Sequence, residues 1–215
     1  MTDRLVFVKV NGWEDTLMAK SRGVSGYPTL ILLTSGGEEV DRIPGFAPPQ
    51  EFVTNINDFL AGRGTLDDLK SRWASFPDSL SLLLQIGDKY QYRGLGTQAD
   101  SCYAELLRRD SANVQGHSAA ALHSMAMVAY AAGHDRYDTA LTRFQAVADR
   151  FPGTKEALDA LTWVPYILTR LERYEEALAG FEKFKVDHPE SPEIEWVNRQ
   201  IEETKRKMGA TPSNI

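Results

Sequence analysis

The chain has 215 residues, of which 42% are hydrophobic and 25% are charged, with a formal net charge of −6. This composition is typical of packed domains and excludes a disordered polymer. The mild acidity argues against a nucleic-acid partner, which requires a broad basic surface. No run of 18 apolar residues occurs, so we expect no membrane span. No signal peptide follows Met1, which predicts a cytoplasmic chain, or an extracytoplasmic one if a signal-bearing segment lies upstream.

The sequence contains a single cysteine, Cys102. One thiol cannot form an intramolecular disulfide, a Cys-x-x-Cys motif or a multi-thiolate zinc site. Cys102 is either a redox-sensing thiol or a small side chain packed between helices, and we favour packing. The four histidines lack the i, i+4 spacing of a helical metal site; they are His117, His123, His134 and His188. We therefore expect no metal, no cofactor and no catalytic residue in this chain.

The first 63 residues predict an α+β module with the order β-α-β-β-α. Its first strand, Leu5–Asn11, is almost continuously apolar, as in a strand buried on both faces. The proline pair Pro48–Pro49 opens the last helix, where a missing N–H costs least. The intervening elements are a short helix at 14–22, a second buried strand at 30–33, a glycine turn at 35–37 and an edge strand at 40–43.

The remaining residues, 64–215, predict an all-α domain. Apolar residues recur at helical spacing, and breaks fall at Pro77, Gly94–Gly96, Gly133, Pro152–Gly153 and Pro189. Short turns between helices favour stacked hairpins, and residues 192–208 predict a capping helix. Pro165 lies inside one predicted helix and predicts a kink or an early break there. The joint between the two domains is expected at 62–66.

An internal repeat lies in the helical domain, because Tyr137–Phe144 matches Tyr174–Phe181 at an offset of 37 residues. Small residues recur where two helices would touch, and a large aromatic residue follows four positions later. The small set is Ala99, Ala140 and Ala177, and the aromatic set is Tyr103, Phe144 and Phe181. This pattern resembles the tetratricopeptide repeat over roughly residues 78–189, which implies about three helix pairs.

The resemblance also implies a concave groove lined by the first helix of each pair. Its positions here are Asp88, Gln91, Thr162, Tyr166 and Thr169. Such a groove would bind a protein or peptide partner. The Lys, Asn and Arg set with which some arrays clamp a C-terminal carboxylate is not present, so we do not expect a chaperone-tail receptor. A scaffold with no peptide in its groove remains an equal alternative.

The first module carries a second resemblance. Gly23–Thr29, followed by an apolar strand, a glycine turn, an edge strand and a last helix, is similar to the thioredoxin family over residues 5–62. The resemblance implies a cis proline at Pro28 and places Tyr27 and Pro28 where that family docks extended peptides. The family's central strand and Trp-Cys-x-x-Cys helix do not occur in this sequence. The truncated sheet should therefore close strand on strand or expose an edge at Leu5–Asn11.

Two functions follow as hypotheses. The first is a non-catalytic protein–protein interaction module that combines a partial thioredoxin-like fold with a helical repeat array. The alternative is the C-terminal fragment of a bacterial-type thiol–disulfide oxidoreductase, whose Cys-x-x-Cys would lie upstream of Met1. A third, weaker hypothesis is that another chain completes the open sheet edge near Leu5–Val10, which would make the protein an oligomer.

Overall fold

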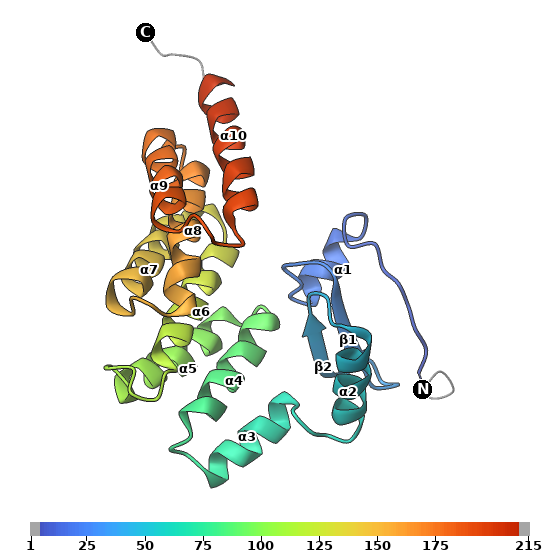
Figure 1. Cartoon of the computed structure of the whole chain (residues 1–215). Helices are drawn as coiled ribbons and strands as arrows, with labels where there is room; N and C mark the ends of the chain where they lie inside the picture. Colours follow the sequence, from blue (N-terminus) through green and yellow to red (C-terminus); the bar gives the residue numbers. More distant parts are fainter. Residues whose placement is uncertain (1–4, 211–215) are drawn as a thin grey trace. The chain divides into compact units, whose positions relative to one another are not determined.

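The computed structural model describes residues 5–210 of the chain. A small two-stranded antiparallel hairpin near the N-terminus is followed by sequentially packed helices (Figure 1). The described residues form two compact units, an N-terminal unit that ends at Gln98 and a C-terminal unit that begins at Ala99.

The N-terminal unit contains four helices and two strands among its described residues. β1 and β2 pair antiparallel, with Leu30 opposite Ile43, and an irregularity in register follows Leu32. The elements are α1 (Thr16–Ser21), β1 (Thr29–Leu33), β2 (Glu39–Pro44), α2 (Pro49–Leu60), α3 (Leu66–Ser75) and α4 (Leu80–Tyr92). The predicted short helix, the hairpin and the last helix of the module are thus present.

Helix α2 covers one face of the hairpin. The buried core between them consists of Leu32, Ile43, Ile56 and Phe59. Proline is the first residue of α2, where the orphan N–H of an ordinary residue would find no partner. The apolar face of α2 and the inward residues of two short strands therefore share one small core.

The predicted first strand is wrong. Residues 5–11 are outside any strand, and the sheet has two strands in the described part of the chain. Val6 is 92% exposed and Val8 79% exposed, although both were expected inside. The physical reason is that no strand among residues 5–210 lies beside this segment to accept its backbone hydrogen bonds. The sheet has therefore not closed strand on strand, and β1 is not buried throughout, since Leu33 is also exposed.

A buried charged network joins the hairpin to the helices of the same unit. Asp41 of β2 is fully buried and lies 3.0 Å from Lys89 Nζ and 3.2 Å from Arg93 Nη2. Its Oδ2 also accepts the backbone N–H of Leu66, at the start of α3, at 3.1 Å. The neighbouring Arg42 donates to the carbonyl of Tyr92 at 2.7 Å. Each buried charge therefore has partners from another element, as burial requires.

This network explains why the N-terminal unit extends beyond the hairpin module. The domain joint predicted at 62–66 lies between α2 and α3, whereas the compact unit ends only at Gln98. The boundary between residues 63 and 64 stays a prediction. The ion pairs of β2 with α4 show that these parts of the chain fold against each other.

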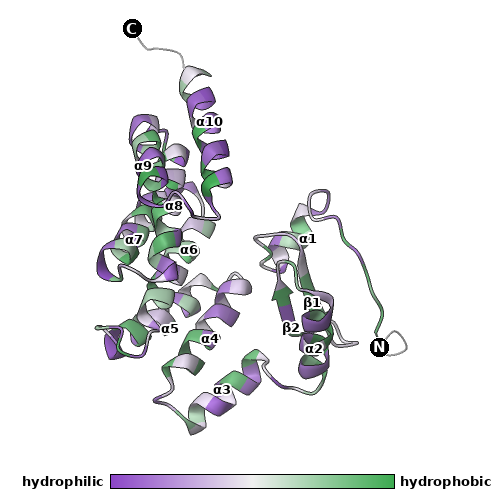
Figure 2. Ribbon diagram, viewed as in Figure 1, coloured by the Kyte–Doolittle hydropathy of each residue, from purple (hydrophilic) through white to green (hydrophobic). Residues whose placement is uncertain are grey.

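The C-terminal unit is a helical array. Helices adjacent in the sequence pack on each other from α6 through α10, and α7, α8 and α9 lie side by side in Figure 1. The helices are α5 (Gly96–Arg109), α6 (Ser118–Ala131), α7 (Tyr137–Arg150), α8 (Lys155–Arg170), α9 (Tyr174–Asp187) and α10 (Ile194–Ala210), with a 3₁₀ turn at His134–Arg136. Helix α10 carries both hydrophobic and strongly hydrophilic residues (Figure 2).

The repeat positions are among the fully buried side chains of this array. All six have no exposed surface: Ala99, Ala140, Ala177, Tyr103, Phe144 and Phe181. An alanine lets two helix backbones approach, and the aromatic residue one turn later fills the adjacent space. The residues matched by the 37-residue offset are therefore buried core positions on α7 and α9.

Helix α8 continues through Pro165 to Arg170, so it does not end early. Pro165 removes one backbone donor, and the carbonyl left without it belongs to Leu161, a residue that is 37% exposed. A Cβ built on Gly180 of α9 would meet the Cβ of Pro165 at 3.0 Å. The absence of a side chain at Gly180 therefore lets α9 approach the proline ring.

Candidate functional site

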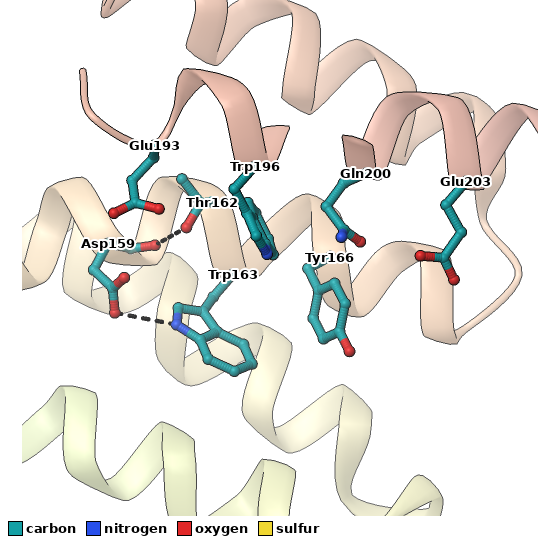
Figure 3. Close-up of a pocket in the computed structure, with 8 residues that line it drawn as sticks. All are labelled: Asp159, Thr162, Trp163, Tyr166, Glu193, Trp196, Gln200 and Glu203. Carbon is teal, nitrogen blue, oxygen red and sulfur yellow. Dashed lines mark hydrogen bonds between the residues drawn. The ribbon is translucent and has the colours of Figure 1, made fainter. Parts of the chain in front are cut away.

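A cavity of about 400 Å³ lies between α8 and α10 of the C-terminal unit (Figure 3). Its walls combine aromatic, acidic and amide side chains. Helix α8 contributes Asp159, Thr162, Trp163 and Tyr166; Glu193 precedes α10, which contributes Trp196, Gln200 and Glu203.

Helical spacing brings these residues to one face of each helix. The α8 residues occupy positions i, i+3, i+4 and i+7, and those of α10 occupy i, i+4 and i+7, so each set forms one stripe. Thr154 caps α8 by accepting the N–H of Ala157 at 3.1 Å. On α10, Val197 and Ile201 form a buried stripe in a core with Phe181 of α9. That packing leaves the neighbouring stripe of α10 facing α8 across the cavity.

The aromatic side chains of the cavity support one another. The Trp163 and Tyr166 rings are 5.5 Å apart between centroids and nearly perpendicular, and the Tyr166 and Trp196 rings are 5.9 Å apart. Trp163 also stacks on the buried Phe144 at 5.4 Å with an interplanar angle of 3°. Such pairs add rigidity beyond simple burial. The cavity wall is therefore anchored to the repeat core.

Carboxylates give the cavity its charge. Asp159 Oδ2 accepts the indole N–H of Trp163 at 3.1 Å and lies 2.6 Å from Nε2 of His123. Glu203 pairs with Lys207 at 2.8 Å, and this hydrogen bond holds the pKa of Glu203 below its usual value. Glu193 is exposed and has no ion pair with any residue between 5 and 210. The cavity therefore presents negative charge at neutral pH.

The structure brings together two of the five predicted groove residues. Thr162 and Tyr166 line the cavity. Thr169 is buried instead, with its Oγ1 2.9 Å from Oγ1 of Thr204, so it joins α8 to α10. Asp88 and Gln91 are half-buried on α4 of the N-terminal unit, outside the cavity.

Most of the cavity was missed by reasoning from the sequence. Trp163 and Trp196 supply much of its aromatic surface, and neither was singled out. The signal was available, since aromatic and acidic residues repeat at helical spacing on two segments that are not consecutive helices. What the sequence did not disclose is that α8 and α10 face each other with α9 between them in the chain.

The second predicted site surrounds Tyr27 and Pro28. The peptide bond between them is cis. The Tyr27 hydroxyl donates to the carbonyl of Gly12 at 3.0 Å, and its ring lies 5.3 Å from that of Trp13. Tyr27 is 47% and Trp13 80% exposed, so this corner of the N-terminal unit is an open apolar surface.

Cys102 is half-buried on α5, between Ala99 and Tyr103 of the repeat core. Residues 5–210 contain no group of three or more His, Cys, Asp or Glu side chains placed to hold a metal ion. Within the same range, none of the helices combines the length and apolar character needed to cross a membrane.

A scan against models of known protein families finds no match to this chain, and a search of curated proteins finds no relative. The structure defines the fold class of the protein in coarse terms. The protein is a small antiparallel hairpin followed by an array of packed helices, with an aromatic and acidic cavity between α8 and α10.

Proposed function

We propose that the protein is a non-catalytic interaction module that binds a peptide segment of a protein partner in the cavity between α8 and α10. The observation that carries this proposal is the cavity itself. Three large aromatic side chains remain partly exposed in a hollow of about 400 Å³, although the array has a well-packed core beside it. Concave sites with aromatic walls and a few polar groups are typical of ligand recognition.

The polar groups of the cavity favour binding over covalent chemistry. The Thr162 hydroxyl donates its proton to the backbone carbonyl of Asp159, in the same helix, at 2.8 Å. No basic group therefore takes this proton to activate the hydroxyl as a nucleophile. Gln200 and the carboxylates are hydrogen-bonding groups suited to orienting a bound chain. The resemblance to tetratricopeptide repeats supports the same proposal, because a groove beside the first helix of a pair includes Thr162 and Tyr166.

In this proposal, the N-terminal unit is a partial thioredoxin-like module. The motif at Gly23–Thr29 supports it, as does the order of β1, the glycine turn, β2 and α2. In the proposal, Tyr27 and Pro28 form an auxiliary surface for extended peptides. The exposed rings of Tyr27 and Trp13 are consistent with such a role.

A peptide-selection experiment tests the main proposal. A random dodecapeptide phage library is panned on the whole chain, and the Kd of the most enriched peptide is measured by fluorescence anisotropy. Tyr166→Ala and Gln200→Ala should each weaken binding several-fold, whereas Val186→Ala on the exposed side of α9 should not. Thermal unfolding of each variant verifies its fold. If no peptide is enriched, or if Val186→Ala is equally weakened, the cavity is not the binding site.

A second candidate function concerns the exposed segment at residues 5–10. Its apolar residues are extended and lie outside the two-stranded sheet. Another strand could cover them by β-augmentation. We propose a second copy of this chain as the occupant. Light scattering should then give a dimer mass that falls to the monomer for Val8→Lys and Val8→Pro, and an unchanged mass would rule this out.

The same segment also bears on the alternative function, a thiol–disulfide oxidoreductase. The thioredoxin-like resemblance would place a strand leading to a Cys-x-x-Cys helix beside residues 5–11. A longer protein containing that segment would be a thiol–disulfide oxidoreductase. The test is insulin reduction by the native protein, together with its intact mass. Turnover by a heavier native form would favour this alternative over a purely binding function.

A further inference from the structure

We infer that the cavity between α8 and α10 selects a basic side chain, arginine or lysine, of its peptide partner. This inference rests on the proposed peptide-binding function and names the chemistry of the bound residue. It depends on the combination of carboxylates with aromatic faces in one hollow. Neither group would be sufficient alone.

The first step of the argument is charge. The eight lining residues include three acidic side chains and no basic one. Glu203 already forms an ion pair with Lys207, so Asp159 and Glu193 are the main acceptors for an incoming cation. The Asp159 side chain is 46% exposed, and one of its two oxygens is held by Trp163 and His123. The cavity therefore repels an acidic peptide and attracts a basic one.

The second step is the aromatic surface. The faces of tryptophan and tyrosine carry negative partial charge and attract cations within about 6 Å of the ring. Trp163, Tyr166 and Trp196 are all half-buried and held in place by their mutual contacts. A guanidinium group can stack on such a face and still direct its N–H groups at a carboxylate. Rings fixed in advance reduce the entropy lost on binding.

The third step is the arrangement of the two kinds of group. Figure 3 shows Asp159 and Glu193 near one end of the cavity and Glu203 near the other, with the aromatic rings between them. A long, flexible basic side chain could therefore lie along the rings with its charged end at Asp159 and Glu193. The aliphatic stem of lysine or arginine suits the apolar part of this path.

The experiment uses the whole chain and the peptides enriched from the random library. Enriched sequences should share an arginine or lysine. The best peptide is synthesised again with that residue replaced by its neutral counterpart, citrulline for arginine or norleucine for lysine. The Kd should rise on the order of tenfold, as loss of a cation–π contact and an ion pair implies.

A pair of variants tests whether the attraction for a basic peptide arises from carboxylates of the cavity. Glu193→Gln should weaken binding of the basic peptide several-fold and leave the neutral peptide unchanged. Glu202→Gln is the matched control, because it removes one exposed carboxylate from α10 outside the cavity. If both variants weaken binding equally, the attraction comes only from the general acidity of the chain, and the inference is overturned.

The outcomes separate the two proposals. Enrichment of peptides with no basic residue, whose binding depends on Tyr166, would overturn the inference and leave the peptide-binding function standing. Enrichment of no peptide at all would overturn both. A basic peptide with the same Kd before and after replacement by the neutral residue would also overturn the inference.

Discussion

Replacing Asp41 by alanine should strongly destabilise the N-terminal unit. The carboxylate of Asp41 is fully buried and has ion-pair partners in Lys89 and Arg93 of the same unit. It also accepts the N–H of Leu66, so its removal leaves a helix-terminal donor without its partner. Both cations are largely buried, with 18% and 10% of their side chains exposed. The variant therefore leaves Lys89 without its carboxylate partner and leaves Arg93 with Glu39 alone.

The expected magnitude follows from the cost of breaking a buried pair, which is about 3–5 kcal/mol. With a urea m value of about 2 kcal/mol/M, the unfolding midpoint should fall by roughly 1.5–2.5 M. Urea unfolding followed by tryptophan fluorescence, to which Trp73 on α3 of this unit contributes, measures the change. Glu38→Ala is the control, since that residue is exposed just before β2. A loss below about 0.5 kcal/mol for Asp41→Ala would refute the reasoning, because surface substitutions alone have that effect.

Three further predictions concern the backbone, the core and pH. Gly23→Ala should cost about 1–3 kcal/mol, since its Cβ would clash with the carbonyl oxygen of Arg93, just after α4. Gly64→Ala, at a similar φ with open space, should cost less in the same urea titration. Phe144→Ala should lower the stability of the C-terminal unit by about 3–5 kcal/mol in calorimetry, since its side chain is fully buried. Burial raises the pKa of Glu39. The hydrogen bond from Arg42 and the charges of nearby arginines lower it by more, so the net pKa lies below the usual value of a glutamate. Its stabilisation is present above the pKa of the unfolded state and is lost as the pH falls through the folded pKa. Glu39→Gln should flatten this acid decline in urea midpoints between pH 7 and pH 3.

Local signals in the sequence predicted most helices of the array. Glycine and proline positions marked most of their ends, and the 37-residue offset identified core positions that are fully buried. Two breaks were missed, at residues 110–117 and 171–173, where no proline occurs and the turns depend on tertiary detail. At the first of them, Asn113 has a positive φ, and the Ser118 hydroxyl donates to the carbonyl of Asp110.

The errors in the N-terminal unit have a different origin. Leu5–Asn11 has the composition of a buried strand, but strand formation requires a neighbouring strand, and its sequence cannot supply one. Similarly, the buried ion pairs of Asp41 depend on how α4 packs against β2, which no local pattern discloses. The cavity was predicted only in small part, since the repeat register placed Thr162 and Tyr166 but not the facing residues of α10.

The central claim is that the cavity between α8 and α10 binds a peptide. The chain has four tryptophans, which give four indole N–H signals in a ¹H–¹⁵N correlation spectrum. Trp163 and Trp196 line the cavity, whereas Trp13 and Trp73 belong to the N-terminal unit. Single Trp→Phe variants assign the signals, and the enriched library peptide is then titrated. We predict shifts of the Trp163 and Trp196 signals with saturation at the measured Kd, and little change of the other two. Saturable shifts confined to Trp13 or Trp73, or no shift of Trp163 and Trp196 at saturating peptide, would contradict the claim.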